Sequence, residues 1–531
     1  MFLIEHRRMV VPSLNSQDKV IDLFVIGGGI NGCGIARDAA GRGLSVALAE
    51  MNDLASATSS ASTKLFHGGL RYLEYYKFRL VREALKEREV LLAAMPHISW
   101  PLRFVFPVDS NQRPAWFIRL GLFIYDHLGG RKILPGTKTL DLQQDPAGKP
   151  LRSGFAKAFE YSDCWVQDSR LVVLNARDAQ SLGADIRVRT QVVSATRFND
   201  PKQGNLWCIK LKSQHASETA EEETVFARAL VNAGGSWVGK IIHDVTNIQS
   251  SENVRLVRGS HIVVKKLFEH DRPYILQGKD GRFAFAIPYE EDFTLIGTTD
   301  LDHHNGLDNI VCTEEEADYL RHFMLEYFQQ PIEKEDIIWS YSGVRPLYDD
   351  GAKSATEATR DYVLSLNQDH GAPLLNVFGG KITTYRRLAE AAFDKLRSYF
   401  PRARSHWTAG TPLPGGDFSI DGVGQLIEKA KTDFPFLTEK TIRRLIRCYG
   451  TEVWKIIGAA HSMNDLGKHF GAGLTEAEVL WQIREEFAHD AEDIVWRRTK
   501  LGLRLSEQEI NDLQVWLDDW FKHQLLDMAV G

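Results

Sequence analysis

The sequence predicts an α/β protein that also has an antiparallel sheet and an α-helical C-terminal domain. Residues 20–26 form an apolar run typical of a buried strand, and a glycine-rich turn and an alanine-rich helical segment follow directly. Residues 282–300 alternate between polar and apolar and break at three acidic residues, which indicates an antiparallel hairpin. Beyond residue 418 the pattern is helical, and the expected core anchors there are Trp454, Trp481, Trp496, Trp516 and Trp520.

Three units of strand and glycine turn organise the first four hundred residues. The first is a complete strand, turn, helix and strand over residues 20–50, and apolar strands within residues 227–240 and 373–396 each run into a Gly-Gly turn. A chain of 531 residues is too long for one ordinary core, so two or three lobes are expected. We expect an interleaved first domain, a Pro- and Gly-rich linker and a helical domain, over residues 18–400, 401–418 and 419–531.

The composition, net charge and cysteine content of the chain exclude several classes of protein. Hydrophobic residues make up 44% and charged residues 25% of the chain, as in soluble globular proteins. The formal charge of −6, with no basic tail, argues against nucleic-acid binding. The five cysteines are far apart and form no CxxC, so we expect free thiols in a reducing compartment and no metal site. No apolar run approaches the length of a membrane span, and the first 17 residues lack the pattern of a signal peptide, so a cytosolic-side protein is expected.

The first glycine turn has the spacing of a dinucleotide-binding site. It reads Gly27-x-Gly29-x-x-Gly32, and Glu50 ends the next strand. The first glycine makes the tight turn, the second lets backbone approach a pyrophosphate, and the third lets helix and strand pack closely. The helix N-terminus then binds phosphate, and Glu50 accepts from ribose hydroxyls. A plain glycine-rich turn is the weaker interpretation, because strand, helix and acidic residue are all present. The motif suits either NAD or FAD.

The two later Gly-Gly turns favour FAD. Ala233-Gly234-Gly235 and Gly379-Gly380-Lys381 follow apolar strands, and the second opens a helix. The positive end of such a helix can stabilise the anion that develops at the pyrimidine end of a reduced flavin, a need that NAD enzymes lack. Either pair alone is compatible with a simple turn. A P-loop is excluded at residues 234–241, because Ile241 stands where Ser or Thr must hold magnesium.

Several cationic residues follow turns or open strands and are candidates for binding an anionic substrate. The planar fork of arginine matches two oxygens of a phosphate or carboxylate. For any one of them a surface salt bridge is the commoner role, and a histidine on an apolar strand is more often structural than a base. The candidates are Arg71, His261, Arg345, Arg360 and Lys381.

Nine segments carry a resemblance to a known family. They read DLFVIGGGINGCGIARDAAGRGLSV, ATSSASTKLFHGGLRYLE, RPAWFIRLGLFIYDHL, FEYSDCWVQDSRLV, RGSHIVV, IGTTD, YSGVRPL, TRDY and FGGKITTYR. In order and identity they resemble the FAD-dependent, respiratory glycerol-3-phosphate dehydrogenases over roughly residues 20–390. The helical tail resembles the C-terminal domain of that family. The match is far more specific than a shared dinucleotide turn.

The resemblance implies both a fold and a reaction. The fold is an FAD-binding Rossmann-like domain of the glutathione-reductase and D-amino-acid-oxidase type, with an antiparallel-sheet substrate (cap) domain. The reaction is oxidation of sn-glycerol 3-phosphate to dihydroxyacetone phosphate, in which hydride leaves C2 for the flavin and a base takes the hydroxyl proton. Ubiquinone or menaquinone then reoxidises the flavin, which implies a cytoplasmic protein peripherally bound to the inner face of the cytoplasmic membrane. The oligomeric state, a homodimer included, stays open.

The resemblance also assigns site residues by motif position. The implied substrate contacts are Arg71, Tyr72, His261, Arg345, Arg360 and Lys381. Among these, Arg71, Arg345 and Lys381 are expected at the phosphate and oxyanion. His261 is the expected base, since histidine titrates near working pH, and His261, Arg345 and Lys381 form the expected catalytic group. The implied flavin contacts are Gly27, Gly28, Gly29, Asn31, Gly32, Glu50, Thr58, Ser59, Ser60, Ser62, Thr63, His67, Gly68, Gly69, Leu70, Val192, Ala233, Gly234, Trp237, Gly343, Gly380, Lys381, Ile382 and Thr383.

Residues 113–125 bear on the membrane expectation. They mix aromatic and cationic side chains and are too short to span a bilayer. Such a helix can lie in the interface, with aromatic anchors and with cations toward anionic lipid, and a buried core helix is at least as good an interpretation. The membrane expectation therefore depends on the resemblance.

Two other functions remain in view. A flavin oxidase would pass electrons from glycerol phosphate or from an amino acid to oxygen. The oxidase variant of this family carries a long mid-chain insertion, which is not evident here. A non-catalytic binding protein on a flavoprotein scaffold would be expected to have lost the glycines or Glu50, and this chain keeps both.

Overall fold

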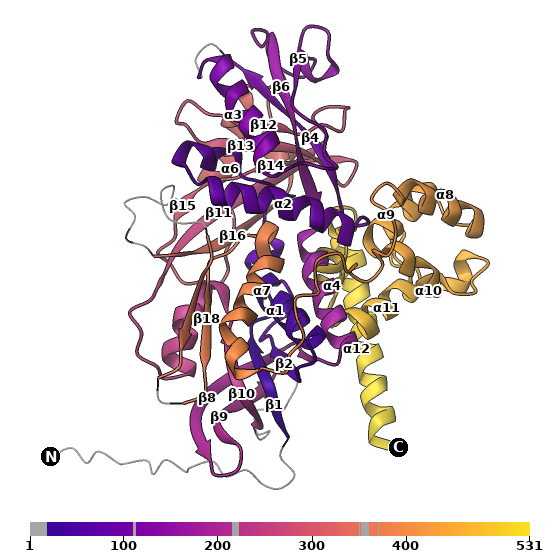
Figure 1. The fold of residues 1–531 in the computed structure, drawn as a ribbon. Coiled ribbons are helices and arrows are strands. Elements are labelled where there is room, and N and C mark those ends of the chain that lie inside the picture. Colours follow the sequence, from indigo (N-terminus) through magenta and orange to yellow (C-terminus); the bar gives the residue numbers. More distant parts are fainter. Residues whose placement is uncertain are drawn as a thin grey trace, which may run out of the picture.

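The computed structural model describes residues 19–109, 113–214, 222–349, 351, 361–369 and 371–530, the last six of these through their backbone alone. Two sheets lie one above the other, and the C-terminal helices gather at one side of both (Figure 1). This is the expected combination of a Rossmann-like α/β domain, an antiparallel sheet and a helical C-terminal region.

The lower sheet of Figure 1 is the doubly wound part of the fold. Its order is β17-β18-β10-β1-β2-β7, with β9 beside β10 and β8 beside β9. The strands from β18 to β7 are parallel, while β17 and the β8–β9 ribbon are antiparallel additions. The bounds are β1 (Val20–Ile26), β2 (Val46–Ala49), β7 (Asp185–Arg187), β8 (Thr190–Asp200), β9 (Gly204–Ser213), β10 (Glu223–Asn232), β17 (Val363–Asn367) and β18 (Leu374–Phe378).

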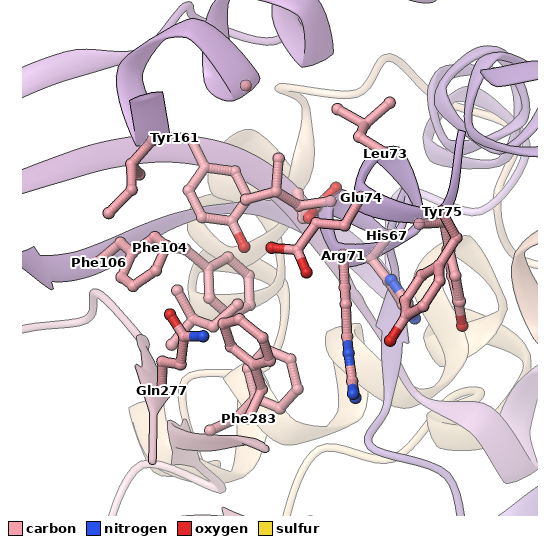
Figure 2. Close-up of a pocket in the computed structure, with 18 of the residues that line it drawn as sticks. His67, Arg71, Leu73, Glu74, Tyr75, Phe104, Phe106, Tyr161, Gln277 and Phe283 are labelled. Carbon is pink, nitrogen blue, oxygen red and sulfur yellow. The ribbon is translucent and has the colours of Figure 1, made fainter. Parts of the chain in front are cut away.

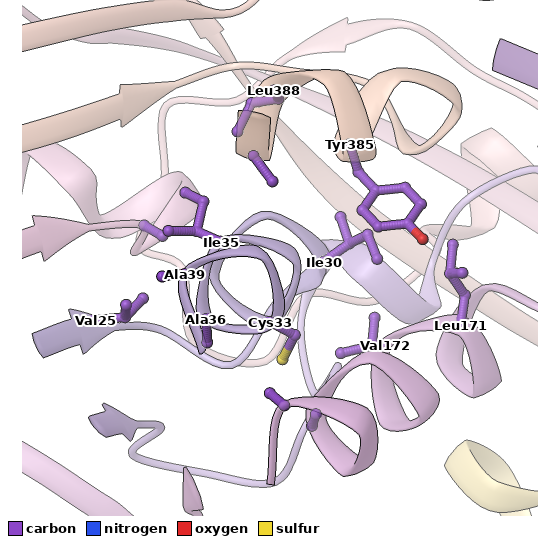
Figure 3. Close-up of a cluster of buried hydrophobic side chains, with 14 of the residues drawn as sticks. Val25, Ile30, Cys33, Ile35, Ala36, Ala39, Leu171, Val172, Tyr385 and Leu388 are labelled. Atoms are coloured by element: carbon purple, nitrogen blue, oxygen red, sulfur yellow. The ribbon is translucent and has the colours of Figure 1, made fainter. Parts of the chain in front are cut away.

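Three helices cover one face of this sheet. They are α1 (Ile30–Gly41), α4 (Asp168–Ser181) and α7 (Tyr385–Leu396). Their apolar side chains, such as Cys33, Val172 and Leu388, belong with Val25 of β1 to one buried cluster (Figure 3). The β8–β9 ribbon covers the opposite face through Trp207, which is 1% exposed. Burial on both faces explains why the parallel strands are apolar runs without alternation.

The upper sheet is largely antiparallel. Its order is β15-β11-β14-β13-β12-β4-β6-β3, with β16 beside β11 and β5 beside β6. The hairpin expected over residues 282–300 is formed by β13 and β14, and positive φ values of 46° and 65° at Glu290 and Glu291 make its turn. The bounds are β3 (Leu65–Phe66), β4 (Ser99–Val108), β5 (Lys138–Asp141), β6 (Lys157–Val166), β11 (Val254–Lys265), β12 (Tyr274–Gln277), β13 (Phe283–Tyr289), β14 (Phe293–Gly297), β15 (Leu301–Asp302) and β16 (Ile337–Tyr348).

The remaining helices surround the upper sheet or form the C-terminal region. Around the upper sheet lie α2 (Phe78–Ala94), α3 (Ala115–Leu128) and α6 (Glu314–Leu325), and the short α5 (Val238–Lys240) follows β10. The C-terminal helices are α8 (Val423–Asp433), α9 (Glu439–Tyr449), α10 (Val453–Ile457), α11 (Glu476–Glu486) and α12 (Glu507–Val530).

The C-terminal region has its own apolar clusters. Their fully buried members include Ile446, Leu513 and Leu517. The five tryptophans expected as core anchors are each only partly buried, so they lie at the margins of these clusters rather than at their centres. Their size explains this position, because a side chain as large as tryptophan is seldom fully buried.

The described residues contain neither a membrane-spanning helix nor a metal-binding cluster. No helix there is both long and apolar enough to cross a bilayer. No group of three or more His, Cys, Asp or Glu side chains in the same residues could hold a metal ion. All five cysteines are free thiols, as expected.

Candidate active site

The first glycine turn leaves no room for side chains. Gly27 follows β1 with a φ of +109°, and a Cβ there would lie 2.6 Å from the carbonyl oxygen of Ala233. A Cβ on Gly32, in the first turn of α1, would lie 1.9 Å from the carbonyl oxygen of Gly27. Both glycines are therefore required for β1, α1 and the end of β10 to meet at this distance.

Glu50 holds this turn in place. One carboxylate oxygen accepts a hydrogen bond from the backbone N–H of Gly28 at 2.7 Å, and the other accepts from that of Asn52 at 2.8 Å. Burial raises the pKa of Glu50, and the two N–H donors act in the opposite direction. Each carboxylate oxygen has a second lone pair, so Glu50 can also accept from a ribose hydroxyl.

A cavity of about 240 Å³, which we call the flavin cavity, lies between the first glycine turn, the loop before β3 and the turn after β18. Many of the sequence-predicted flavin residues line it. These are Gly29, Asn31, Thr58, Ser59, Ser62, Thr63, His67, Ala233, Gly343, Gly380, Lys381 and Ile382.

The other expected flavin residues lie elsewhere. Gly27, Gly28, Gly32 and Glu50 form the body of the turn, while Val192 and Thr383 are buried. Gly69 and Leu70 line a second cavity in front of the first. Ser60 and Trp237 line a cleft that faces residues 492–510 of the C-terminal region. Gly68 is buried beside Leu85 and Tyr125, and Gly234 packs on Ile241.

The hydroxyl groups of the loop before β3 are largely engaged within the chain. Thr58 donates to the carbonyl of Val344 at 2.6 Å, and Ser62 donates to the Asp168 carboxylate at 2.7 Å. The Ser59 oxygen accepts from the N–H of Ile30 at 3.0 Å. These bonds fix the course of the loop, so its contacts to a bound group come from the lone pairs and backbone that remain.

The second cavity, which we call the front cavity, has a volume of about 680 Å³. Aromatic side chains from the upper sheet, including Phe104, Phe106 and Phe283, surround it, and Arg71 points into the same space (Figure 2). Five residues line both cavities and so mark their junction. They are Thr63, Leu65, His67, Tyr72 and Arg345.

The cations expected at the substrate gather around this junction. The guanidinium of Arg345 pairs with the Asp300 carboxylate and donates to the Thr298 hydroxyl at 2.9 Å. The Lys381 ammonium lies 3.7 Å from the centre of the Tyr72 ring, a cation–π contact. Arg71 lies over the ring of Phe283 at 5.7 Å. Arg360 lies outside the described residues.

His261 does not reach either cavity. His261 is 1% exposed, and its Nε2 lies 2.9 Å from the hydroxyl oxygen of Thr63. Burial, with the nearby Arg345 and Lys64, holds the pKa of His261 well below its usual value. The histidine that does line both cavities is His67, which sequence reasoning placed only beside the flavin.

A buried group of polar side chains supports the His-Gly-Gly turn. The N–H of Gly68 donates to the Tyr125 hydroxyl at 2.8 Å, and that hydroxyl donates to the Asp163 carboxylate at 2.8 Å. Arg88 completes the group with an ion pair to Asp163 at 2.7 Å. Sequence reasoning missed these residues, although Asp163 and Tyr125 fall inside segments that carried the resemblance.

The residues of the flavin cavity fit FAD. Gly29 at the N-terminus of α1 provides no side-chain cap, and beyond the Ile30 N–H that Ser59 accepts from, this helix end presents the partial positive charge that suits a pyrophosphate. The Oδ1 atom of Asn31 is buried and has no hydrogen-bond partner within the described part of the chain, and a hydroxyl or N–H of a bound group would satisfy it.

Two family models match the chain. The model described as FAD dependent oxidoreductase covers residues 22–386. The model described as C-terminal domain of alpha-glycerophosphate oxidase covers residues 406–514.

Curated relatives match nearly the whole chain. A D-erythritol 1-phosphate dehydrogenase from Brucella abortus is 50% identical, over 95% of this chain and 99% of its own. A glycerol-3-phosphate dehydrogenase from Pseudomonas aeruginosa is 48% identical, over 95% and 96%. The aerobic glycerol-3-phosphate dehydrogenase of Escherichia coli is 45% identical, over 95% and 98%. Among solved structures, a glycerol-3-phosphate dehydrogenase from Bacillus halodurans complexed with FAD has a TM-score of 0.73 at 25% identity, covering 94% of both chains.

Proposed function

The chain belongs to the family of FAD-dependent oxidoreductases, and from this premise we propose that it oxidises sn-glycerol 3-phosphate to dihydroxyacetone phosphate. The observation that carries the proposal is the junction of the two cavities. There the glycine-lined flavin cavity opens toward Arg71, Arg345 and Lys381 in the space where a small anion would meet the flavin. Such a cluster suits a phosphate monoester more than a single carboxylate.

The residues at the junction divide into binding and positioning roles in this proposal. FAD supplies the hydride acceptor when it is bound. Arg345 and Arg71 bind the phosphate dianion, and the Asp300 carboxylate orients the Arg345 guanidinium. Lys381, held over the Tyr72 ring, contributes positive charge where negative charge develops. The aromatic wall of the front cavity excludes water, which strengthens these interactions.

D-erythritol 1-phosphate is a second candidate substrate. The specific observation is the relative that is 50% identical over 99% of its length and bears that substrate in its name. The front cavity, at about 680 Å³, is large enough for one additional CHOH unit. Both candidates are polyol monophosphates, so the same cationic cluster serves either.

Quinone is the proposed electron acceptor. The front cavity is lined by Phe104, Phe106, Phe283 and Phe285, and it reaches the surface beside Tyr76 and Phe117. An apolar ring system fits an aromatic wall of this kind. A relative named as the aerobic enzyme supports the same acceptor.

A peripheral contact with the inner face of the cytoplasmic membrane belongs to this proposal. Trp116, Leu120 and Phe123 on α3 are 68%, 47% and 52% exposed, and Tyr76 beside the mouth of the front cavity is 81% exposed. Aromatic side chains next to cations such as Arg113 suit the interface of an anionic bilayer. A quinone could then enter the cavity directly from the lipid.

Anaerobic stopped-flow mixing tests the proposed reaction. The yellow holoprotein is mixed with sn-glycerol 3-phosphate, and in a parallel series with D-erythritol 1-phosphate, while the visible flavin band is followed. We expect glycerol 3-phosphate to bleach the flavin. Failure of both compounds would refute a polyol-phosphate substrate, and faster bleaching by erythritol phosphate would move the assignment to the second candidate.

Reoxidation of the bleached flavin then tests the acceptor. We expect slow recolouring with air and fast recolouring with a short-chain ubiquinone or menaquinone. Fast recolouring with air alone would instead identify a flavin oxidase.

A further inference from the structure

The hydroxyl group of Thr63 lies between the junction of the two cavities and the buried His261. We propose that Thr63 is a catalytic residue, whose hydroxyl takes the C2 hydroxyl proton of the substrate and passes its own proton to Nε2 of His261. The inference rests on the proposed function. It gives Thr63 a role beyond contact with the flavin, and it makes His261 a positioning residue that acts through Thr63.

Thr63 is accessible from the junction, whereas His261 is not. Thr63 lines both the flavin cavity and the front cavity, so a substrate at their junction can touch its hydroxyl. His261 lines neither cavity, and its residue is 1% exposed. The distance of 2.9 Å between Thr63 Oγ1 and His261 Nε2 is that of a hydrogen bond. Among the residues that the structure describes, Thr63 is therefore the hydrogen-bond link between the junction and His261.

The imidazole of His261 is surrounded by two cations and two uncharged residues. The ring faces Tyr341 and Arg345 of β16, Lys64 of the loop before β3, and Gly297 of β14. The Lys64 charge is balanced by Asp168 and that of Arg345 by Asp300. Burial and the two cations hold the pKa of His261 low and so keep the ring neutral, and the lone pair of Nε2 can then accept a hydrogen bond from the Thr63 hydroxyl. Nδ1 has no hydrogen-bond partner in the described residues, which leaves Thr63 as the polar contact of the ring.

Thr63 and His261 are held in place by the same tyrosine, and a relay needs both of its groups in fixed places. The His261 ring stacks on the Tyr341 ring, with centroids 4.8 Å apart and planes 12° apart. The Tyr341 hydroxyl donates to the carbonyl of Ser62 at 2.8 Å, so the same tyrosine also holds the residue next to Thr63. A Cβ on Gly297 would lie 2.1 Å from Cδ2 of His261, so the ring fills the space left by that glycine.

The proposed relay balances in atoms and electrons. The C2–H bond breaks, and its hydrogen leaves with the electron pair for the cofactor. The substrate O–H bond breaks as a new O–H bond forms on Thr63, and the original Thr63 O–H bond breaks as an N–H bond forms at Nε2. The alcohol becomes a ketone, the cofactor gains two electrons, and the neutral imidazole gains one proton and becomes imidazolium. That proton returns through Thr63 to the cavity after the ketone has left.

Thr63→Val and Thr63→Ser test the proposal in the anaerobic flavin-reduction assay. Positioned proton transfer contributes roughly 10²- to 10⁴-fold to a rate, so we expect Thr63→Val to slow flavin reduction about 100-fold or more. Thr63→Ser keeps the hydroxyl and should stay within about fivefold of the native rate. Flavin content, the visible spectrum and the substrate concentration for half-maximal rate should be unchanged in both.

Thr246→Val is the matched control. It removes another buried threonine hydroxyl, which donates to the carbonyl of Ile242 at 2.7 Å, from a place outside both cavities. Its flavin-reduction rate should be native. Failure of the native protein to be bleached would refute the proposed function itself, whereas a native rate for Thr63→Val would refute this inference alone.

His261→Asn and the double variant Thr63→Val/His261→Asn separate a relay from a merely structural role. Groups that act as one unit lose about the same rate singly and together. We therefore expect each single variant and the double variant to be slowed equally, and the solvent isotope effect on flavin reduction to fall in each. Multiplicative losses would overturn the proposal. A large loss in His67→Asn with only a small loss in Thr63→Val would assign the proton to His67 instead.

Discussion

At the scale of single residues, Arg345 has the clearest expected effect on substrate binding. Its guanidinium lies at the junction of the cavities and pairs with Asp300. Arg345→Ala removes one cation and its ion pair with the Asp300 carboxylate. The phosphate dianion then loses the attraction of the guanidinium and is repelled by the carboxylate. A hydrogen bond between charged groups is worth about 1.5–3 kcal/mol, which corresponds to a rise in KM of about 10- to 100-fold. Steady-state kinetics with a soluble electron acceptor measure this.

Arg255→Ala is the control for Arg345→Ala. Arg255 of β11 pairs with Asp302 of the neighbouring strand β15 at 2.6 Å and lines neither cavity. The Arg255→Ala variant should therefore have the KM of the native protein. Removing the carboxylate as well, in Arg345→Ala/Asp300→Asn, should recover part of the lost affinity. A native KM for Arg345→Ala would show that this residue does not bind the phosphate.

The sequence predicted residues that shape a local turn better than residues whose position depends on packing between distant strands. Gly27, Gly32 and Glu50 were predictable, since a tight turn, a close approach and a strand-end carboxylate are properties of a short segment. The place of His261 was not. Its burial depends on Gly297 and Tyr341, which come from other strands and meet it only in the folded sheet. A histidine on an apolar strand gives no local signal for this.

At the scale of elements, α3 has one buried face and one exposed face. Ile118, Leu122 and Tyr125 are buried against the upper sheet, while Trp116 and Phe123 face outward. The mixture of aromatic and cationic residues in the sequence could not distinguish a buried core helix from a helix at a membrane interface, because both faces of the helix are apolar. Only the packing of one face fixes the other as exposed, and the membrane proposal depends on that exposed face.

Trp116→Ser/Phe123→Ser tests the exposed face of α3. Neither side chain lines a cavity, so anaerobic flavin reduction should be native. Each half-exposed aromatic ring contributes on the order of 1 kcal/mol when it enters an apolar phase, so binding to vesicles of anionic phospholipid should weaken about tenfold or more. Co-sedimentation with such vesicles measures the binding.

Val515→Ser is the control for the α3 variant. Val515 is 54% exposed on α12, a helix that lies away from α3 (Figure 1), so vesicle binding should not change. Equal binding by the α3 variant and the native protein would place the membrane contact elsewhere.

At the scale of the whole molecule, buried ion pairs join the C-terminal region to the flavin domain. Asp53 lies in the loop after β2, and its carboxylate accepts hydrogen bonds from the Arg498 guanidinium at 2.6 and 2.7 Å. Arg170 of α4 pairs with Glu486 of α11, and both are buried. Partners more than 300 residues apart in the chain have no sequence signal, because each charge alone is typical of a solvated surface. The docking of the helical region was therefore beyond prediction from the sequence.

His97 lies inside this interdomain contact. It is fully buried, with both ring nitrogens lacking hydrogen-bond partners in the described residues. A Cβ on Gly450 would lie 3.1 Å from its Cγ, and the Phe418 ring is 6.4 Å away, so the C-terminal region covers the ring. Burial, together with Arg170, Arg447 and Arg177, lowers the pKa of His97 to about 3.

This pKa predicts loss of stability in acid. An unfolded histidine titrates near 6.5, so between pH 6.5 and about 3 the unfolded chain binds a proton at His97 that the folded chain does not. The stability contributed by the neutral ring is therefore complete above pH 6.5 and falls by about 1.4 kcal/mol per pH unit below it. His97→Leu removes the titrating group, so its melting temperature, measured from pH 8 to pH 5, should start lower because of altered packing but fall less steeply below pH 6.5. Parallel curves for the two proteins would show that His97 does not couple protonation to the docking of the C-terminal region.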